Sequence, residues 1–333
     1  MKYGDRLMGN ERSNRLKAVV KQFENIKALV VGDIMLDEYI WGKVKRISPE
    51  APVPVVEVIS KTYTLGGAGN VAANIASLNA EVYLSGIIGE DSQGLILKQE
   101  LEKRRIAQDG LMIESEYPTI TKSRVIAHDQ QIARLDIERR GSLSDLLESK
   151  IIDWVNKIIG QADVCVVSDY GKSVISDKIS KYIIELANKY KKPVVVDPKG
   201  VDYYKYARAT VITPNMQEVE KVMNCELENE EDLNRAALNI SQALDGSAIL
   251  VTRGSEGMSL FINGANRIDI PAEAKSLYDV TGAGDTFVGT LALALGANVD
   301  LEHASIIANA AAGIAVEKLG VATISQEELI LRL

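Results

Sequence analysis

A glycine-rich turn with an aspartate at its end is the segment best suited to chemistry, and it lies in residues 279–287, DVTGAGDTF. A glycine-rich turn that leads into a helix leaves backbone N–H groups unpaired, and with the helix dipole they attract an anion. Asp285 would lie in the first turn of this helix, beside the anion. A carboxylate is unfavourable there unless it deprotonates a hydroxyl that attacks phosphorus. An ordinary helix start with an acidic first turn explains the same residues, and the motif alone favours that simpler interpretation.

Residues 65–72, LGGAGNVA, form a second glycine-rich segment before a predicted helix. Gly67, Gly69 and Ala72 fit the dinucleotide fingerprint GxGxx[GA], which should directly follow the first buried strand. Here about thirty residues intervene, which argues against a dinucleotide site. We therefore favour close approach of the backbone to a small polar ligand, with Asn70 offering hydrogen bonds. Tight packing of a helix on a sheet is the structural alternative for these glycines.

Asn215 and Glu218 lie three residues apart at a predicted helix start and therefore face the same side. Such a pair could hold a hydrated Mg²⁺ ion, which keeps most of its waters and needs few carboxylates. The same spacing is that of a capping box, with Asn215 as the N-cap. Spacing alone favours the capping interpretation.

Two lysines and one further turn follow other buried segments. Lys172 and Lys199 each lie just past a predicted strand end, where either could meet a phosphate, although a solvated surface lysine is the ordinary case. Residues 252–257, TRGSEG, are by themselves an ordinary turn before a predicted strand at 258–262.

Several other kinds of site are not supported. The chain has no GxxxxGK[ST], HExxH or GxSxG motif, and His128 and His303 are far apart. Cys165 and Cys225 form no CxxC pair, so neither a zinc site nor a disulfide framework is expected.

The composition indicates an ordinary globular protein. The 333 residues are 46% hydrophobic and 25% charged, and the formal net charge of −8 argues against general binding to nucleic acid or anionic membranes. The N-terminus is polar without the apolar core of a signal peptide, and no apolar run is long enough to span a bilayer. We expect a soluble, cytoplasmic protein.

Short apolar runs alternate with helical stretches, which predicts a doubly wound α/β fold with a mostly parallel sheet flanked by helices. The predicted strands are 27–33, 82–88, 164–167, 194–196, 210–212 and 249–251, and the predicted helices include 10–24, 92–104, 143–159, 176–190 and 230–244. From Phe287 to the C-terminus the pattern is helical. Ligands bind beyond the carboxyl ends of such strands, where Asp33, Asp169, Asp197 and Asn215 fall.

Two segments break this alternation. Residues 39–63 contain three prolines and alternating apolar residues, and residues 119–138 indicate two strands around a turn at 129–131. We predict antiparallel strands set apart from the main sheet, which together form a small β lid over the crevice. No linker is visible, so we expect one domain over residues 1–333.

Taken together, these motifs resemble the ribokinase-type (PfkB) carbohydrate kinases. The resemblance runs from Val30 to about Ser325 and rests on the early GGAGN at 66–70, the NMQE at 215–218 and the late GAGD ending at 285. It implies a ribokinase-like fold, ATP as phosphoryl donor and Mg²⁺. In that family, lids often pair between two subunits, which implies a homodimer.

Within the family, the likeness is closest to the D-glycero-β-D-manno-heptose-7-phosphate kinases. It rests on residues 32–37, 46–55, 122–131 and 168–172, although Ser173 stands where a glycine often follows. It implies phosphorylation of the sugar 1-hydroxyl to give heptose 1,7-bisphosphate on the route to ADP-heptose. It also implies the stand-alone form of the kinase, without a C-terminal nucleotidyltransferase domain.

The resemblance further implies roles for individual residues. Asp285 would be the base for the sugar hydroxyl, and the amides of Gly282, Ala283 and Gly284 would stabilise charge on the transferred phosphoryl group. Asn215 and Glu218 would position Mg²⁺ and the ATP phosphates. The residues expected to line the nucleotide are Thr252, Gly254 and Gly257, with Asn309 nearby.

The sugar phosphate would be held from the other side of the crevice. The residues expected to hold its hydroxyls are Asp33, Gly66, Gly67 and Asn70, and the candidate cations for its 7-phosphate are Lys172, Arg124 and Lys199. Three alternatives stay open: a kinase for another acceptor such as ribose, a fructose phosphate or a nucleoside; a nicotinamide-dependent dehydrogenase that uses residues 67–69; and a protein that only binds its ligands.

Overall fold

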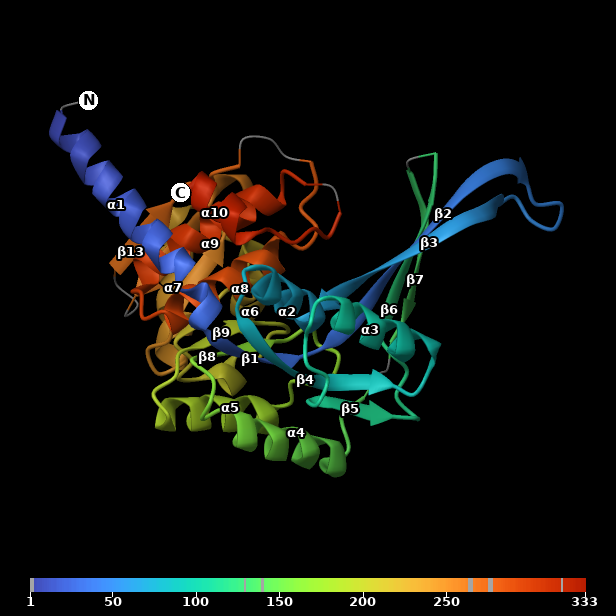
Figure 1. Cartoon of the computed structure of the whole chain (residues 1–333), viewed down its shortest axis with the longest axis horizontal. Helices are drawn as coiled ribbons and strands as arrows, with labels where there is room; N and C mark the ends of the chain where they lie inside the picture. The colour runs from blue at the N-terminus through green and yellow to red at the C-terminus, as the bar shows by residue number, and fades with distance from the viewer. Residues whose placement is uncertain (1–2, 129, 139–140, 263–265, 275–277, 319) are drawn as a thin grey trace.

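The computed structural model describes residues 3–128, 130–138, 141–262, 266–274, 278–318 and 320–333. Figure 1 shows a layered body in which helices cover both faces of a central sheet, while a second, smaller sheet projects from one side. None of the helices in these ranges is long and apolar enough to cross a membrane.

The central sheet contains nine strands of the described chain in the order β13-β12-β11-β10-β9-β8-β1-β4-β5. Neighbours from β11 to β5 pair in parallel, whereas β12 and β13 add an antiparallel edge. The strands are β1 (Lys27–Gly32), β4 (Glu81–Gly89), β5 (Leu111–Glu114), β8 (Val164–Ser168), β9 (Val194–Asp197), β10 (Val211–Ile212), β11 (Ala248–Thr252), β12 (Met258–Ile262) and β13 (Asn266–Ile270). The predicted doubly wound, mostly parallel sheet is confirmed.

Two apolar cores explain why the strands have continuous apolar sequences. In β1, Ala28 and Val30 face one core, while Leu29 and Val31 face the other, because successive side chains point to opposite faces. The first core also receives α1 (Tyr3–Lys21), α2 (Ala68–Ser77), α3 (Ser92–Lys103), α8 (Ala283–Gly296), α9 (Leu301–Ala315) and α10 (Gln326–Arg332). The second receives α4 (Asp145–Ile158), α5 (Asp177–Lys189), α6 (Met216–Met223) and α7 (Glu230–Ala243).

The projecting sheet is the predicted β lid. Its strands β2 (Ile34–Ile47), β3 (Pro54–Gly67), β6 (Thr121–Ala127) and β7 (Gln130–Ile137) lie in the order β3-β2-β6-β7. Each hairpin is antiparallel as predicted, and β2 and β6 pair in parallel, a contact between the hairpins that the sequence analysis did not address. The two hairpins leave the body in the same direction and join through their first strands. Asp129, at the predicted turn, lies outside the described residues.

The lid strands are longer than predicted, and this changes the second glycine-rich segment. β3 runs directly into α2, so Gly66 and Gly67 end a strand and are not a loop. Gly67 has a φ of 56°, and a Cβ there would lie 2.3 Å from the backbone oxygen of Asp33. A Cβ on Gly66 would lie 2.4 Å from a carboxylate oxygen of Asp37. Both glycines therefore allow β3 to pack closely on β2, and their placement in a lid strand gives no support to a dinucleotide fingerprint.

One close approach of β1 to β8 gives a test of this packing. A Cβ on Gly32 would lie 2.1 Å from the backbone oxygen of Ser168. We expect Gly32→Ala to lower the free energy of unfolding by about 1–3 kcal/mol, because the strands must separate to accept the methyl group. The measurement is urea unfolding, with Gly160→Ala as the control. The control Cβ would lie 3.6 Å from Tyr190, an ordinary contact, so equal losses in the two variants would contradict the packing described.

Candidate active site

A cavity of about 220 Å³ lies where the carboxyl ends of β8, β9 and β11 meet the start of α8. Its lining residues are Asp169, Tyr170, Asp197, Pro198, Lys199, Thr213, Asn215, Glu218, Thr252, Gly284, Phe287 and Val288. The prediction that polar strand ends meet in one crevice is confirmed for Asp169, Asp197 and Asn215.

Asp285 is the third residue of α8, and its side chain is almost fully buried. One carboxylate oxygen accepts a hydrogen bond from the Tyr170 hydroxyl and the other from Nδ2 of Asn70, both at 2.6 Å. Burial raises the pKa of Asp285 to about 6, although the hydrogen bonds from Tyr170 and Asn70 act to lower it. The charge of Asp37 also raises this pKa, and that of Lys122 lowers it. The result is a carboxylate that is ionised at neutral pH yet basic enough to accept a proton.

The turn before Asp285 has the shape expected of an anion site. Gly282 adopts a left-handed conformation with φ of 80° and precedes the first residue of α8. The amide of Ala283 donates to the oxygen of Val280, whereas within the described chain no acceptor is recorded for the amides of Gly282 and Gly284. A Cβ on Gly284 would meet open space. The amides of Gly282 and Gly284 are therefore available to a phosphate oxygen.

Asn70 is fixed by a chain of hydrogen bonds between α2 and α8. Asn74 donates to the side-chain oxygen of Asn70 at 3.3 Å and to its backbone oxygen at 2.9 Å, and the hydroxyl of Thr286 donates to Asn74 at 2.8 Å. This chain aims the amide of Asn70 at Asp285. The early glycine-rich segment and the late GAGD segment are thus brought together, as the resemblance implies.

Asp33, which was expected to hold sugar hydroxyls, is buried beneath the segment that follows β8. Its carboxylate is fully buried and accepts hydrogen bonds from the backbone amides of Tyr170, Lys172 and Val174 at 2.8–3.0 Å. Burial raises the pKa of Asp33, and two of these amides are the main opposing influence. Asp33 has no exposed surface, and its hydrogen bonds hold the segment that follows β8.

The three candidate cations for a sugar phosphate each have a carboxylate partner. Arg124 pairs with Asp37 inside the lid, and Lys172 pairs with Glu138 at 2.6 Å. Lys199 pairs with Glu218 at 2.7 Å. Lys199 therefore lines the cavity together with Asn215, Glu218 and Thr252, the residues expected to hold the metal and the nucleotide.

Asn215 and Glu218 form a capping box and also line the cavity. The side chain of Asn215 accepts from the amide of Glu218 at 3.0 Å, and Glu218 accepts from the amide of Asn215 at 3.1 Å. Capping thus fixes both side chains at the cavity edge. Among the described residues no group of three or more His, Cys, Asp or Glu side chains could hold a metal ion. Two oxygen-bearing side chains nevertheless suit an ion such as Mg²⁺ that keeps most of its waters.

Of the residues expected to line the nucleotide, Thr252 lies in the cavity lining and Gly254, Gly257 and Asn309 lie outside it. Thr252 lines the cavity and bridges to Asn215. Gly254 begins the short helix η3 (Gly254–Glu256) and Gly257 follows it, both outside this lining, and Gly257 packs against the end of β13. Asn309 is buried in α9, where its side chain donates to the oxygen of Pro271 at 2.8 Å.

The structure adds residues to which the sequence analysis gave no role. Tyr170 contacts Asp285, and the charges of Asp37 and Lys122 act on it. The pKa of Asp197 is raised well above its ordinary value by burial and by the charges of Asp285 and Glu218. Asp37 and Tyr170 were noted only as parts of the family-like segments 32–37 and 168–172, and the position of these segments beside strand ends is the sequence signal that could have identified them.

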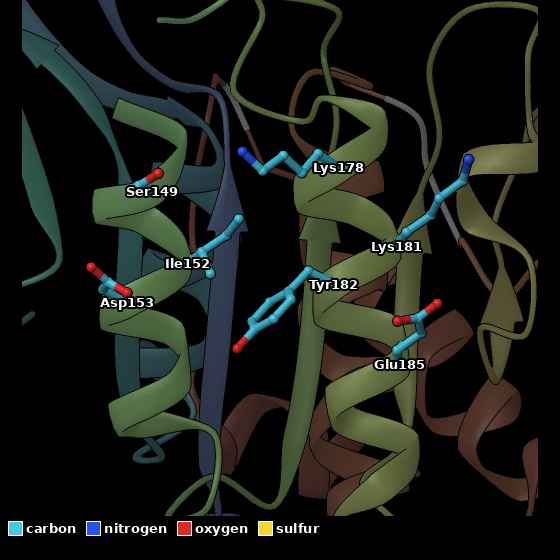
Figure 2. Close-up of a pocket in the computed structure, with 7 residues that line it drawn as sticks. All are labelled: Ser149, Ile152, Asp153, Lys178, Lys181, Tyr182 and Glu185. Atoms are coloured by element: carbon cyan, nitrogen blue, oxygen red, sulfur yellow. The ribbon is translucent and has the colours of Figure 1, made fainter. Parts of the chain in front are cut away.

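A second hollow of about 450 Å³ lies between α4 and α5 (Figure 2). Its rim carries charges of both signs, from Asp153, Glu185, Lys178 and Lys181, on exposed helix faces. It contains neither the helix start nor the buried carboxylates, so the candidate active site is the cavity at α8.

Known proteins resemble this chain over most of its length. The family model described as pfkB family carbohydrate kinase matches residues 25–328. The bifunctional protein HldE of Citrifermentans bemidjiense is 44% identical over 306 residues, which cover 92% of this chain and 63% of that protein. The protein of the same name from Geobacter sulfurreducens is 42% identical over 305 residues, 92% of this chain and 62% of the relative. The chain thus spans less than two thirds of the length of these relatives.

Solved structures show the same fold at low sequence identity. A ribokinase of Arabidopsis thaliana complexed with ribose and ATP superimposes with a TM-score of 0.73 and 22% identity, covering 92% of this chain and 98% of that one. The tetrameric inhibited form of phosphofructokinase-2 from Escherichia coli superimposes with a TM-score of 0.74 and 21% identity, covering 91% of this chain and 96% of that one. The fold is ribokinase-like, and the protein is a carbohydrate kinase. It belongs to the pfkB family, which removes the dehydrogenase and binding-only alternatives.

The pKa of Asp285 gives a prediction for the pH dependence of this kinase. We expect kcat/KM to fall as the pH drops through about 6, because Asp285 must be ionised in the free enzyme to accept a proton. Burial raises this pKa above its ordinary value, so activity is lost at higher pH than for an exposed aspartate. The measurement is kcat/KM from pH 5 to 8 with unfolding monitored at each pH. A flat profile in the folded protein would contradict the role of Asp285.

Proposed function

We propose that this kinase transfers the γ-phosphoryl group of ATP to the 1-hydroxyl of D-glycero-β-D-manno-heptose 7-phosphate. The product, heptose 1,7-bisphosphate, would serve the synthesis of ADP-heptose. The observation that carries the proposed chemistry is the buried Asp285 at the start of α8, which follows the cavity residue Gly284 and is influenced by the charges of Asp37 and Lys122 in the lid. The acceptor is supported by the likeness of the lid and strand-end segments to heptose-7-phosphate kinases and by the relatives named HldE.

In the proposed reaction, Asp285 accepts the proton of the sugar 1-hydroxyl. The sugar oxygen then forms a bond to the γ-phosphorus as the bond from that phosphorus to the oxygen bridging to the β-phosphate breaks, and ADP leaves. The open amides of Gly282 and Gly284 would stabilise negative charge on the transferred group. The lid would exclude water, which otherwise competes as acceptor.

The donor side of the site would be formed by the cavity residues. Asn215 and Glu218 would hold Mg²⁺ through water, and Thr252 would contact the nucleotide. When bound, Mg²⁺ would neutralise phosphate charge during transfer. Lys199 was a candidate for the sugar phosphate. It would bind an ATP phosphate instead, because its side chain pairs with Glu218 in this cavity. Gly254, Gly257 and Asn309 would shape the outer part of the nucleotide site.

The acceptor side would be formed by α2 and the lid. Asn70 would orient the hydroxyl that meets Asp285, and Gly66 and Gly67 would keep β3 close to β2. Arg124 and Lys172 would bind the 7-phosphate, which would replace Asp37 and Glu138 as their partners. Arg124 suits this exchange because its planar guanidinium binds phosphate with two hydrogen bonds.

The main test replaces the proposed base. We expect Asp285→Asn to abolish turnover of heptose 7-phosphate, while ATP binding and the free energy of unfolding at pH 7 are retained, because burial disfavours the charge that the substitution removes. Substantial turnover by the folded variant would show that Asp285 is not the base.

For the acceptor, ATP consumption is compared for heptose 7-phosphate, fructose 6-phosphate and ribose. Preference for either of the last two would overturn the proposed substrate.

We also propose that two copies of the chain associate through their lids. β3 and β7 are the edges of the lid sheet, and large apolar side chains such as Ile59 and Leu135 are exposed on them. Unpaired edges with apolar surface favour association. We expect a dimer in sedimentation experiments and a monomer for Leu135→Glu. Leu331→Glu, at an exposed site on α10, is the control; a monomeric parent protein would contradict the proposal.

A further inference from the structure

Tyr170 makes a direct contact with the proposed base that the reaction described above does not use. Its hydroxyl donates to Asp285 at 2.6 Å, and its side chain lies two residues beyond β8. Burial raises the pKa of Tyr170 well above its ordinary value, and the charge of Asp285 raises it further. The phenol therefore remains protonated, and it is the donor in this contact.

The segment that carries Tyr170 is held from two sides. Asp33 binds its backbone amides from below, as described for the active site. At its start, Asp169 accepts from the amide of Gly171 at 2.7 Å. The backbone amides of residues 170–172 are thus held by two buried carboxylates, those of Asp33 and Asp169, neither of which contacts Asp285 directly.

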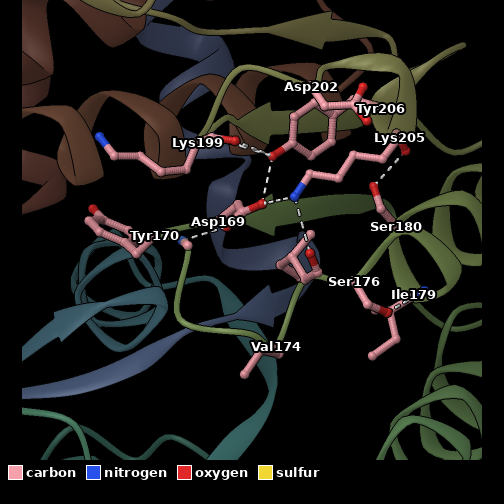
Figure 3. Close-up of polar contacts among 12 residues, drawn as sticks. Asp169, Tyr170, Val174, Ser176, Ile179, Ser180, Lys199, Asp202, Lys205 and Tyr206 are labelled. Carbon is pink, nitrogen blue, oxygen red and sulfur yellow. Dashed lines mark hydrogen bonds and ion pairs between the residues drawn. The ribbon is translucent and has the colours of Figure 1, made fainter. Parts of the chain in front are cut away.

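Asp169 is in turn held by a buried network that reaches the short helix η2 (Tyr204–Tyr206), as Figure 3 shows. The same oxygen of Asp169 accepts from Nζ of Lys205 and from the hydroxyl of Tyr206, each at 2.6 Å. Lys205 also donates to the oxygen of Ile175 at 3.2 Å. Only 14% of the Lys205 side chain and 2% of that of Asp169 are exposed, so loss of either partner would leave a buried charge.

We propose that Tyr170 is a positioning residue for phosphoryl transfer: it orients the carboxylate of Asp285 and keeps it in the proton-accepting form. The buried pair Asp169–Lys205, together with Tyr206, fixes the segment that presents Tyr170. This inference rests on the proposed role of Asp285 as base. It gives the buried contacts among Asp169, Lys205 and Tyr206 a role in positioning the proposed base.

A shift in the pH profile separates this role from a purely structural one. The groups that act on Asp285 come from several elements: Asn70 from α2, Asp37 from β2, Lys122 from β6, Tyr170 after β8 and Asp197 at the end of β9. The Tyr170 hydrogen bond lowers the pKa of Asp285. Removal of this hydrogen bond leaves burial and the neighbouring carboxylates of Asp37 and Asp197 in place, so the pKa of Asp285 should rise.

The experiment compares pH profiles of kcat/KM for the full chain with ATP and heptose 7-phosphate. We expect the acidic limb of Tyr170→Phe to move to higher pH, and kcat at pH 7 to fall about 10- to 100-fold, since the base is less well oriented. Lys205→Met should move the limb in the same direction. Tyr204→Phe, an exposed tyrosine of the same short helix, should leave the profile unchanged.

An unmoved acidic limb in folded Tyr170→Phe would overturn the inference. If Tyr170→Phe does not fold, the profiles of Lys205→Met and Tyr206→Phe decide in the same way. The outcome is distinct from a failure of the proposed function, which would appear as turnover by Asp285→Asn. An inactive Asp285→Asn with an unmoved Tyr170→Phe limb would reject only the role given to Tyr170.

Discussion

The placement of one carboxylate in a nearly dry site is the constraint on which the rest of the structure depends. Asp285 lies at the start of α8, where the helix dipole favours negative charge but burial opposes it. Two hydrogen bonds, from Asn70 and Tyr170, offset part of that opposition. Burial and hydrogen bonding act in opposite directions, and their balance leaves a group that is charged at neutral pH and still basic.

Segments far apart in the chain converge to create that balance. The donor Asn70 comes from α2, which directly follows the lid strand β3, and Tyr170 comes from the end of β8. Each donor is fixed by further buried polar groups, Asn70 by Asn74 and Thr286, and Tyr170 by its neighbouring carboxylates. The parallel sheet places the carboxyl ends of its strands at one edge, and the lid strand β3 runs directly into the helix that carries Asn70.

Much of this arrangement could be predicted from the sequence, because strands buried on both faces give continuous apolar runs. The early and late glycine-rich segments meet in the hydrogen bond from Asn70 to Asp285, and the Asn215–Glu218 pair lines the neighbouring cavity. The partners of the charged residues could not be predicted, because each depends on a contact between distant segments. Lys199 was one of three candidates for the sugar phosphate, and it pairs with Glu218 in the cavity, while Asp33 is buried beneath the segment of Tyr170. The parallel pairing of β2 with β6 is equally non-local.

The central claim is that Asp285 faces the acceptor hydroxyl while the sugar phosphate lies toward the lid. A crystal structure with a non-hydrolysable ATP analogue, Mg²⁺ and heptose 7-phosphate tests it most directly. The account predicts the 1-hydroxyl oxygen within hydrogen-bond distance of Asp285, the γ-phosphate at the amides of Gly282 and Gly284, and the 7-phosphate at Arg124 or Lys172. A bound sugar phosphate with no hydroxyl near Asp285 would contradict it.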